Sequence, residues 1–457
     1  MSIVQLNVST LIGAKPSTLQ QTGAILSFGA TTLAAGAYAA LTQDSDLTSL
    51  LAPAQSLSSL TWSGGTVTAT AANPIAGLTS GDTFLTTISG ASPIAYNGTV
   101  TATVTGPSTF TYPLAANPGS ETTPGTYTPG NQVYLGLAVK DFFAQGTRRA
   151  IYVLELGAAD ATTGPTALST WIAANPGVFY VYLVPKSWDG SANFIALANT
   201  LKSDTSKTYF FVTTTTGTYA PYAGIKSILA MVEAPGVSTT EFDAAEPMQA
   251  VLSYAPSSTN RLTPLAYTFL NDATIYPVLG NQSLLAALDA ANVNYVASAA
   301  EGGISNAMIS SGALQDGEDF SWWYAVDYLQ INAQQVSANV VINGSNNSIN
   351  PLWYSQDGIN RLQDAQYKLL KNMGAYALTQ ASPQRATLDQ QTFIDALDNG
   401  DYDGQNVVNA VPFADYIAAN PAQYQDNTYG GLTIAFWAPQ LFKHLIINVL
   451  VQNYVAG

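Results

Sequence analysis

The sequence contains no cysteine and a single histidine, His444. Without cysteine the chain cannot form a disulfide bond or supply the thiolate ligands of the common zinc sites. His444 lies in an apolar segment, where a packing role is far more common than catalysis. Cys-His and Ser-His-Asp catalysis and Cys/His zinc binding are therefore not expected.

Charged residues are also scarce, at 9% of the 457 residues, against about 25% in an average globular protein. The 14 cations are outnumbered by 29 anions, which gives a net charge of −15. Such a chain repels a phosphate backbone, so we do not expect a nucleic-acid partner. The apolar content of 47% is sufficient for a buried core, and the length corresponds to roughly three domains.

Long hydrophobic runs and phosphate-binding glycine patterns are missing as well. Residues 1–16 have neither the basic segment nor the apolar segment of a secretion signal, and no stretch approaches the length of a membrane span. No G-x-G-x-x-G motif follows a predicted strand, and no P-loop is present. We expect a protein that is made in the cytoplasm, with no membrane partner and no cofactor.

The segment 57–130 differs in composition from the rest of the chain, because it consists mainly of Thr, Ser, Gly, Ala and Pro. Residues 66–70 and 100–105 alternate between apolar and polar side chains, and Asn97-Gly98 is typical of a two-residue hairpin turn. Aromatic residues can supply a core: Trp62, Phe84, Tyr96, Phe110 and Tyr112. We predict a small inserted all-β domain, a sandwich-like fold or a barrel, over 57–130.

Apolar strands and amphipathic helices alternate around this insertion. Strands are predicted at 23–29, 149–156, 178–185, 209–215 and 248–254. Helices are predicted at 133–144, 165–174, 191–201 and 222–232. This alternation favours a largely parallel sheet, so the predicted class is α/β within a multidomain α+β chain. Residues 21–56 and 131–256 would form one α/β domain.

Residues 257–440 are predicted to form a mixed α+β core domain, with a helix at 284–291 and a strand at 293–298. The most regular helix pattern in the chain lies at 358–374, where Asp364 and Lys368 have the spacing of an ion pair. Three cations of an otherwise acidic chain lie on this helix within eleven residues: Arg361, Lys368 and Lys371. The simplest interpretation is a solvated helix face.

Two acidic patterns could carry chemistry, and both are weak. Residues 399–404 match the first half of an EF-hand loop, but Ala410 occupies the position of the bidentate glutamate. Asp316, Glu318 and Asp319 precede two tryptophans, as in a glycosidase site, although acids this close in sequence are typical of a solvated turn. We therefore predict no catalytic, metal-binding or cofactor-binding residues.

The two ends of the chain, 1–20 and 441–457, are predicted to be arms, and within them residues 2–11 and 445–452 alternate like β-strands. The apolar faces consist of Val4, Leu6 and Val8 at the N-terminal end and of Leu445, Ile447, Val449 and Val451 at the C-terminal end. A lone strand cannot satisfy its own backbone groups, so each segment must join a sheet. That sheet belongs either to the chain itself or to a neighbouring subunit.

In its order of elements the chain resembles the contractile tail sheath proteins of bacteriophages. The resemblance rests on the N-terminal strand, on 23–29, on Val139–Gly146 leading into the strand at 149–156, and on the long helix at 358–374 followed by a terminal strand. Residues 57–130 depart from the core pattern and resemble the small β modules that phage structural proteins carry as exposed insertions.

The resemblance implies a structural, non-enzymatic subunit of the virion tail, assembled in the host cytoplasm. Hexameric rings would stack around a tail tube, linked by exchanged terminal strands, and would contract to drive the tube through the host envelope. The implied partners are further copies of the chain, the tail tube protein, and baseplate and tail terminator proteins. In such proteins a helix of the C-terminal core faces the tube, so Arg361, Lys368 and Lys371 become candidate tube contacts.

Two other classes of function remain open on the sequence. The Thr-rich module and the low charge would suit a surface adhesin or an S-layer-like protein, although no secretion signal is recognisable. The acidic residues 316–319 beside two tryptophans would suit a carbohydrate-active enzyme, although their pattern is weak.

Overall fold

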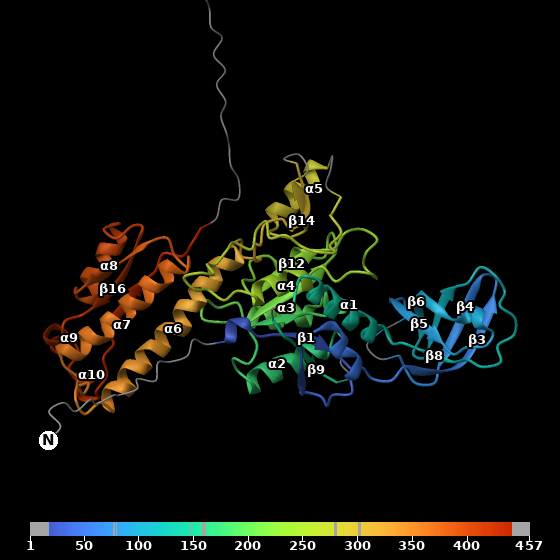
Figure 1. Cartoon of the computed structure of the whole chain (residues 1–457), viewed down its shortest axis with the longest axis horizontal. Coiled ribbons are helices and arrows are strands. Elements are labelled where there is room, and N and C mark those ends of the chain that lie inside the picture. The colour runs from blue at the N-terminus through green and yellow to red at the C-terminus, as the bar shows by residue number, and fades with distance from the viewer. Residues whose placement is uncertain are drawn as a thin grey trace, which may run out of the picture.

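The computed structural model of the chain is elongated, with a small barrel at one end, an α/β layer in the middle and a helix-rich part at the other end (Figure 1). It describes residues 18–440 except 76–77, 79, 148, 158–160, 278–280 and 300–302. The terminal segments predicted to form strands lie outside the described residues. None of the described helices is long and apolar enough to span a bilayer.

The middle part is built on a six-stranded sheet in the order β12-β11-β10-β1-β9-β2. Five strands run parallel, and β2 lies antiparallel to β9 at one edge. The strands are β1 (Gly23–Ser27), β2 (Tyr38–Leu41), β9 (Ile151–Glu155), β10 (Val181–Leu183), β11 (Tyr209–Thr214) and β12 (Ile228–Val232). The winding direction of the parallel strands reverses between β1 and β10, as in doubly wound sheets. The predicted α/β class is confirmed.

Helices cover both faces of this sheet. One face packs against α1 (Gly130–Ala144) and α4 (Ala245–Leu252), and the other packs against α2 (Gly164–Ala174) and α3 (Ala192–Thr200). Successive side chains of a strand point to opposite faces, so both sets of strand residues are buried and the strands read as continuous apolar runs. This explains why most of these strands are recognisable in the sequence.

Two elements of the α/β layer were predicted wrongly. Residues 222–232 contain the buried strand β12 and a preceding turn, not a helix. Residues 248–254 belong largely to helix α4, not to a strand. Both are short apolar runs, whose periodicity fits a strand and a buried helix equally well. In α4, Met248 and Val251 lie three positions apart and pack into one core, which decides for the helix.

The inserted part is a closed barrel in the order β3-β4-β7-β6-β5-β8. Its strands are β3 (Gln55–Ser63), β4 (Thr66–Ala71), β5 (Thr83–Ser89), β6 (Gly98–Gly106), β7 (Thr109–Pro113) and β8 (Thr126–Tyr127). Closure is achieved by β8, which pairs with both β3 and β5. Of the two all-β forms left open by the sequence, the structure is therefore the barrel and not a sandwich.

The hairpin turn predicted at Asn97-Gly98 is wrong. Residues 90–97 form a longer connection between β5 and β6, and the Asn97 side chain closes it through hydrogen bonds of 2.9 Å with the backbone N–H and C=O of Ala91. A two-residue turn of the barrel is found instead at Gly64-Gly65, between β3 and β4, where both glycines have positive φ angles. Such φ angles are what a type I′ hairpin requires.

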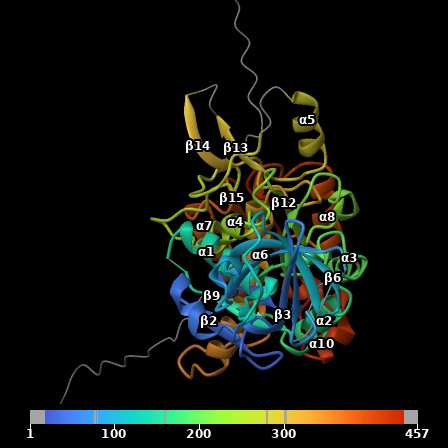
Figure 2. The ribbon, with the colours of Figure 1, turned by 90° about the vertical axis from the view of Figure 1, so that its right-hand side faces the viewer.

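The C-terminal part contains a long helical hairpin, a three-stranded sheet and a smaller α/β extension. Its helices are α5 (Gln282–Ala290), α6 (Phe320–Ser345), α7 (Gln356–Ala375), α8 (Gln390–Asp398), α9 (Phe413–Ala419) and α10 (Pro421–Gln425). Its strands are β13 (Val296–Ala299), β14 (Ile304–Ile309), β15 (Ser382–Ala386), β16 (Gln405–Ala410) and β17 (Leu432–Ala435). Figure 2 shows α5, β13 and β14 grouped on one side of the molecule.

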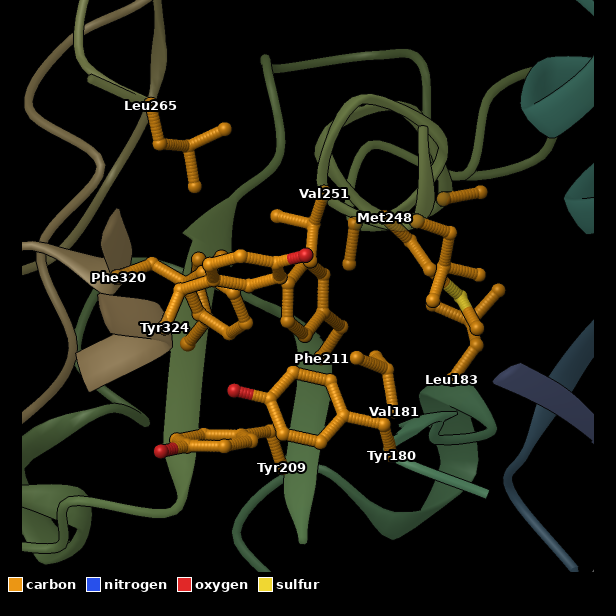
Figure 3. Close-up of a cluster of buried hydrophobic side chains, with 14 of the residues drawn as sticks. Tyr180, Val181, Leu183, Tyr209, Phe211, Met248, Val251, Leu265, Phe320 and Tyr324 are labelled. Carbon is orange, nitrogen blue, oxygen red and sulfur yellow. The ribbon is translucent and has the colours of Figure 1, made fainter. Parts of the chain in front are cut away.

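The first turns of α6 join the C-terminal part to the α/β sheet. Phe320 and Tyr324 pack against Tyr180 and Tyr209 of the sheet (Figure 3). One turn further along, the buried Asp327 carboxylate accepts hydrogen bonds of 2.8 Å from both tyrosine hydroxyls. Burial raises the pKa of Asp327 to about 6. This shared core and polar network fix the direction in which the α6–α7 hairpin leaves the sheet.

Candidate functional site

The rotation of α7 about its axis is fixed by two buried glutamines. The Gln363 amide donates to the carbonyl oxygens of Ala386 (2.7 Å) in β15 and Val408 (2.9 Å) in β16. The Gln366 amide donates to the carbonyl oxygen of Ala333 in α6, at 2.9 Å. These bonds hold α7 between α6 and the C-terminal sheet, so its remaining face is presented outward.

That outward face carries the three cations singled out in the sequence, but they have different surroundings. Lys368 and Lys371 are exposed. Arg361 is half-buried and its guanidinium donates to the carbonyl oxygens of Pro351 (3.2 Å) and Asn350 (3.4 Å) in the α6–α7 connection. Arg361 thus stabilises the tip of the helical hairpin, whereas the two lysines are available for contacts with another molecule.

A fourth cation, Arg385 of β15, extends this face. Its guanidinium lies 2.7 Å from the Asp364 carboxylate and 3.9 Å above the Tyr367 ring. Asp364 therefore pairs with Arg385, and no ion pair with Lys368 is recorded among the described residues. The sequence spacing predicted Lys368 as the partner of Asp364. The actual partner, Arg385, lies in a strand after α7, and a contact of that kind cannot be recognised from helical periodicity.

The tip of the α6–α7 hairpin exposes large apolar side chains. Ile342 at the end of α6 is 61% exposed, and in the connection Ile349 is 77% and Trp353 73% exposed. Isolated exposed apolar residues are common on protein surfaces, but a bulky set within twelve positions is typical of an interaction surface. This tip adjoins Arg361, so the cationic face of α7 and the apolar tip are continuous.

The C-terminal sheet has the order β15-β16-β17 and therefore two outer strands. Pro383 in β15 has no backbone N–H to offer to a further strand. The outer strand β17 contains no proline, and its four residues are half-buried. The edge of β17 is accordingly the one that can accept another strand. The strand residues predicted at the termini lie outside the described residues, so their pairing stays a prediction.

At the carboxyl end of the parallel sheet, a side chain of the protein itself binds the backbone N–H donors of two loops. The Glu155 carboxylate accepts hydrogen bonds from the backbone N–H of Gly29 (2.6 Å) and Gly157 (2.8 Å) and from the hydroxyls of Ser27 and Thr31 (both 2.7 Å). This is the edge at which doubly wound sheets hold phosphate groups. The internal carboxylate uses the donors that an anionic ligand would need.

Two of the three acidic residues considered for catalysis have structural roles, and the third, Glu318, is exposed. Asp316 accepts a hydrogen bond of 2.8 Å from the Trp323 indole N–H, and Asp319 caps α6 by accepting one of 2.7 Å from the backbone N–H of Ser321. No group of three or more His, Cys, Asp or Glu side chains that could hold a metal ion occurs among the described residues.

No protein-family model matches the chain, and no curated protein matches it by sequence. A chain of the anti-feeding prophage baseplate, solved by cryo-EM with six-fold symmetry applied, is similar in structure with a TM-score of 0.52 and 11% identity. This similarity covers 99% of the present chain and 98% of the other.

A sheath tail protein of Listeria innocua aligns with a TM-score of 0.38 and 11% identity over 78% of the present chain and 85% of the other. The similarity to the baseplate chain extends over nearly the whole of both chains, so it includes the barrel, the α/β layer and the C-terminal part. The fold of the chain is therefore similar to that of a baseplate chain of the anti-feeding prophage over nearly its full length.

Proposed function

We propose that the chain is a structural subunit of a contractile tail sheath, without enzymatic activity. The observation that carries this proposal is the similarity of fold to a baseplate chain of the anti-feeding prophage over 99% of the present chain. The subunits would form rings, with hexamers as the expected unit, that stack around a tail tube in the virion and end at baseplate and terminator proteins. Assembly would take place in the host cytoplasm.

We assign the sheath core to residues 21–56 with 131–256 and to residues 257–440. Residues 57–130 form an insertion that decorates the core. The position of the barrel at one end of the elongated molecule supports this division (Figure 1). An insertion that projects from one end can be carried without disturbing contacts made at the opposite end.

The terminal segments 1–20 and 441–457 would link subunits by strand exchange. Their alternating apolar faces need a sheet, and the edge of β17 can accept a strand. About five strand hydrogen bonds at about 1 kcal/mol each would contribute roughly 5 kcal/mol per arm before the ordering entropy is subtracted. Repeated in every subunit, such links could keep the polymer connected while it contracts.

The first test is negative-stain electron microscopy of the full-length protein beside a variant lacking residues 1–12. We expect rings or tubes from the full chain and their loss on truncation, because the strand that would pair with a neighbour is removed. The matched variants keep the length of the arm: Val4, Leu6 and Val8 changed to Ser should abolish polymers, whereas Gln5 and Asn7 changed to Ser should not. Polymers that form equally well in every variant would rule out N-terminal arm exchange.

We further propose that the outward face of α7 contacts the tail tube. Lys368 and Lys371 are exposed, and Arg361 and Arg385 border them on a chain of net charge −15. A local cationic face on an acidic molecule favours an acidic partner surface and orients the approach. The contact would be broken during contraction, so a modest affinity per subunit, summed over many subunits, suits the role.

Reversal of both lysine charges, Lys368→Glu with Lys371→Glu, is expected to reduce co-assembly with the tube protein at least tenfold, an effect of about 1.4 kcal/mol. Sedimentation of tubes with bound sheath subunits measures this. Lys202→Glu with Arg261→Glu introduces the same change of net charge at exposed positions elsewhere and should leave co-assembly unchanged. Equal effects of the two pairs would show that only net charge matters and would refute a tube contact through α7.

A further inference from the structure

A cavity of about 280 Å³ lies where helix α4 meets the end of α1 and the segment that leads into the C-terminal part. Its wall includes Gln145, which follows α1, and Glu246 and Gln249 of α4. Arg261 and Phe269, from the segment after α4, complete it. The volume is at the lower end of the range of ligand pockets, roughly 300–1,000 Å³, so only a small molecule fits. The sheath function proposed above makes no use of this cavity.

Three residues that line this cavity have a buried oxygen atom with no hydrogen-bond partner among the described residues. One is Oε2 of Glu246, a side chain that is only 1% exposed, and the others are the hydroxyls of Ser253 and Tyr254. Buried polar atoms in folded proteins are almost always hydrogen-bonded. An unpartnered carboxyl oxygen on the wall of a cavity indicates that a group inside the cavity supplies the missing partner.

The electrostatic surroundings favour a positively charged partner. Burial is the main cause that raises the pKa of Glu246 to about 10, and the negative charges of Asp243, Asp141, Glu241 and Asp272 add to it. No lysine is among the described residues that line the cavity. Lys186 pairs with Glu233 at 2.7 Å, and the exposed Lys140 lies beside Asp141 at 3.4 Å. An ammonium group that enters the cavity would exchange with the proton of Glu246 and pair with the carboxylate.

The mouth of the cavity has features that suit the rest of such a molecule. Phe269 is 60% exposed there, and an aromatic face attracts both alkyl chains and cations. The exposed Arg261 also lines the cavity, and a guanidinium is suited to a carboxylate. The cavity therefore combines a buried acid, an aromatic ring and a cation.

We propose that this cavity binds a small primary amine, whose ammonium group is held by Glu246 and Ser253, and that a carboxylate on the same molecule adds affinity through Arg261. The ligand class is thus a short alkylamine or, preferably, a small amino acid. An occupant would connect α4 to the segment 261–270, which leads into the C-terminal part.

Isothermal titration calorimetry of the full-length protein near pH 7.5 tests the proposal with three probes. We expect γ-aminobutyrate to bind, propylamine to bind more weakly, and propionate not to bind. Binding of either amine should release up to one proton, so the observed heat should differ between phosphate and HEPES buffers, whose ionisation enthalpies differ. No amine binding at millimolar concentration would overturn the proposal.

Variants separate the roles of the residues. Glu246→Gln should weaken amine binding by about 10- to 100-fold and abolish proton release, because it removes the charged partner but keeps the shape. This variant should fold, since glutamine keeps the size of the side chain and replaces a buried carboxyl of which Oε2 has no partner among the described residues. Arg261→Ala should weaken γ-aminobutyrate alone, and Glu318→Gln, at an exposed position, should change nothing. Amine binding that survives Glu246→Gln unchanged would refute the assignment.

Discussion

Replacing Glu155 with alanine is expected to destabilise the α/β part of the chain by about 3–5 kcal/mol. The carboxylate accepts five hydrogen bonds, from Ser27, Gly29, Gly157 and twice from Thr31. Its removal leaves these donors without an acceptor in a site that is almost fully buried. The lost interactions connect β1 to β9 at the centre of the sheet, so the loop after β1 should loosen first.

Guanidinium unfolding followed by tryptophan fluorescence measures this effect, because Trp171 and Trp188 are buried in the same layer. Glu318→Ala, which removes an exposed carboxylate, should change the free energy of unfolding by less than about 0.5 kcal/mol. Millimolar acetate or phosphate should partly restore the Glu155→Ala variant and leave the unmodified protein unaffected, since the anion would occupy the vacated donors. A loss below 1 kcal/mol without rescue by anions would contradict this role of Glu155.

The sequence is most informative where local pattern and burial agree. Strands β9 and β11 are continuous apolar runs because both faces of the sheet are covered, and they were predicted at nearly the observed positions. The failures, at 222–232 and 248–254, are short apolar runs whose state depends on what packs against them. In the second, contact with α1 and the sheet decides for a helix, and a single sequence carries no record of that contact.

The outward face of α7 shows the same difference between what a local pattern predicts and what depends on tertiary contacts. Helical spacing located Arg361, Lys368 and Lys371 on one helix, but the binding of Arg361 to the hairpin tip and the pairing of Asp364 with Arg385 depend on tertiary contacts. The role of Glu155 was missed as well. An acid at the end of an apolar strand, two residues before a glycine, was the available signal, although it does not identify the donors on the loop after β1.

Raising the pH above 4 is expected to weaken the packing of α4 against α1 progressively. Burial raises the pKa of Asp243 to about 7 and that of Glu246 to about 10, whereas both groups ionise near 4 in the unfolded chain. Between these values the folded chain binds more protons than the unfolded chain. Stability therefore falls as pH rises, by up to about 1.4 kcal/mol per pH unit for each group, until its folded pKa is passed.

Denaturant unfolding at pH 5, 7 and 9 checks this dependence, and two substitutions separate the contributions of Asp243 and Glu246. Asp243→Asn should remove only the contribution of Asp243, which ends near pH 7, and Glu246→Gln should remove a contribution that runs from about pH 4 to about pH 10. Asp327, with a pKa raised to about 6, contributes in the same direction and remains in both variants.

Asp389→Asn is the matched control for these pH profiles. Hydrogen bonds from Thr392 lower the pKa of Asp389, so the ionised form of this residue favours the folded chain. Its contribution to the slope has the opposite sign and is confined to pH values below the pKa of an ordinary aspartate. The profile between pH 5 and 9 should therefore keep its slope in this variant. A flat profile in the unmodified protein would contradict the raised pKa values of Asp243 and Glu246 in the folded chain.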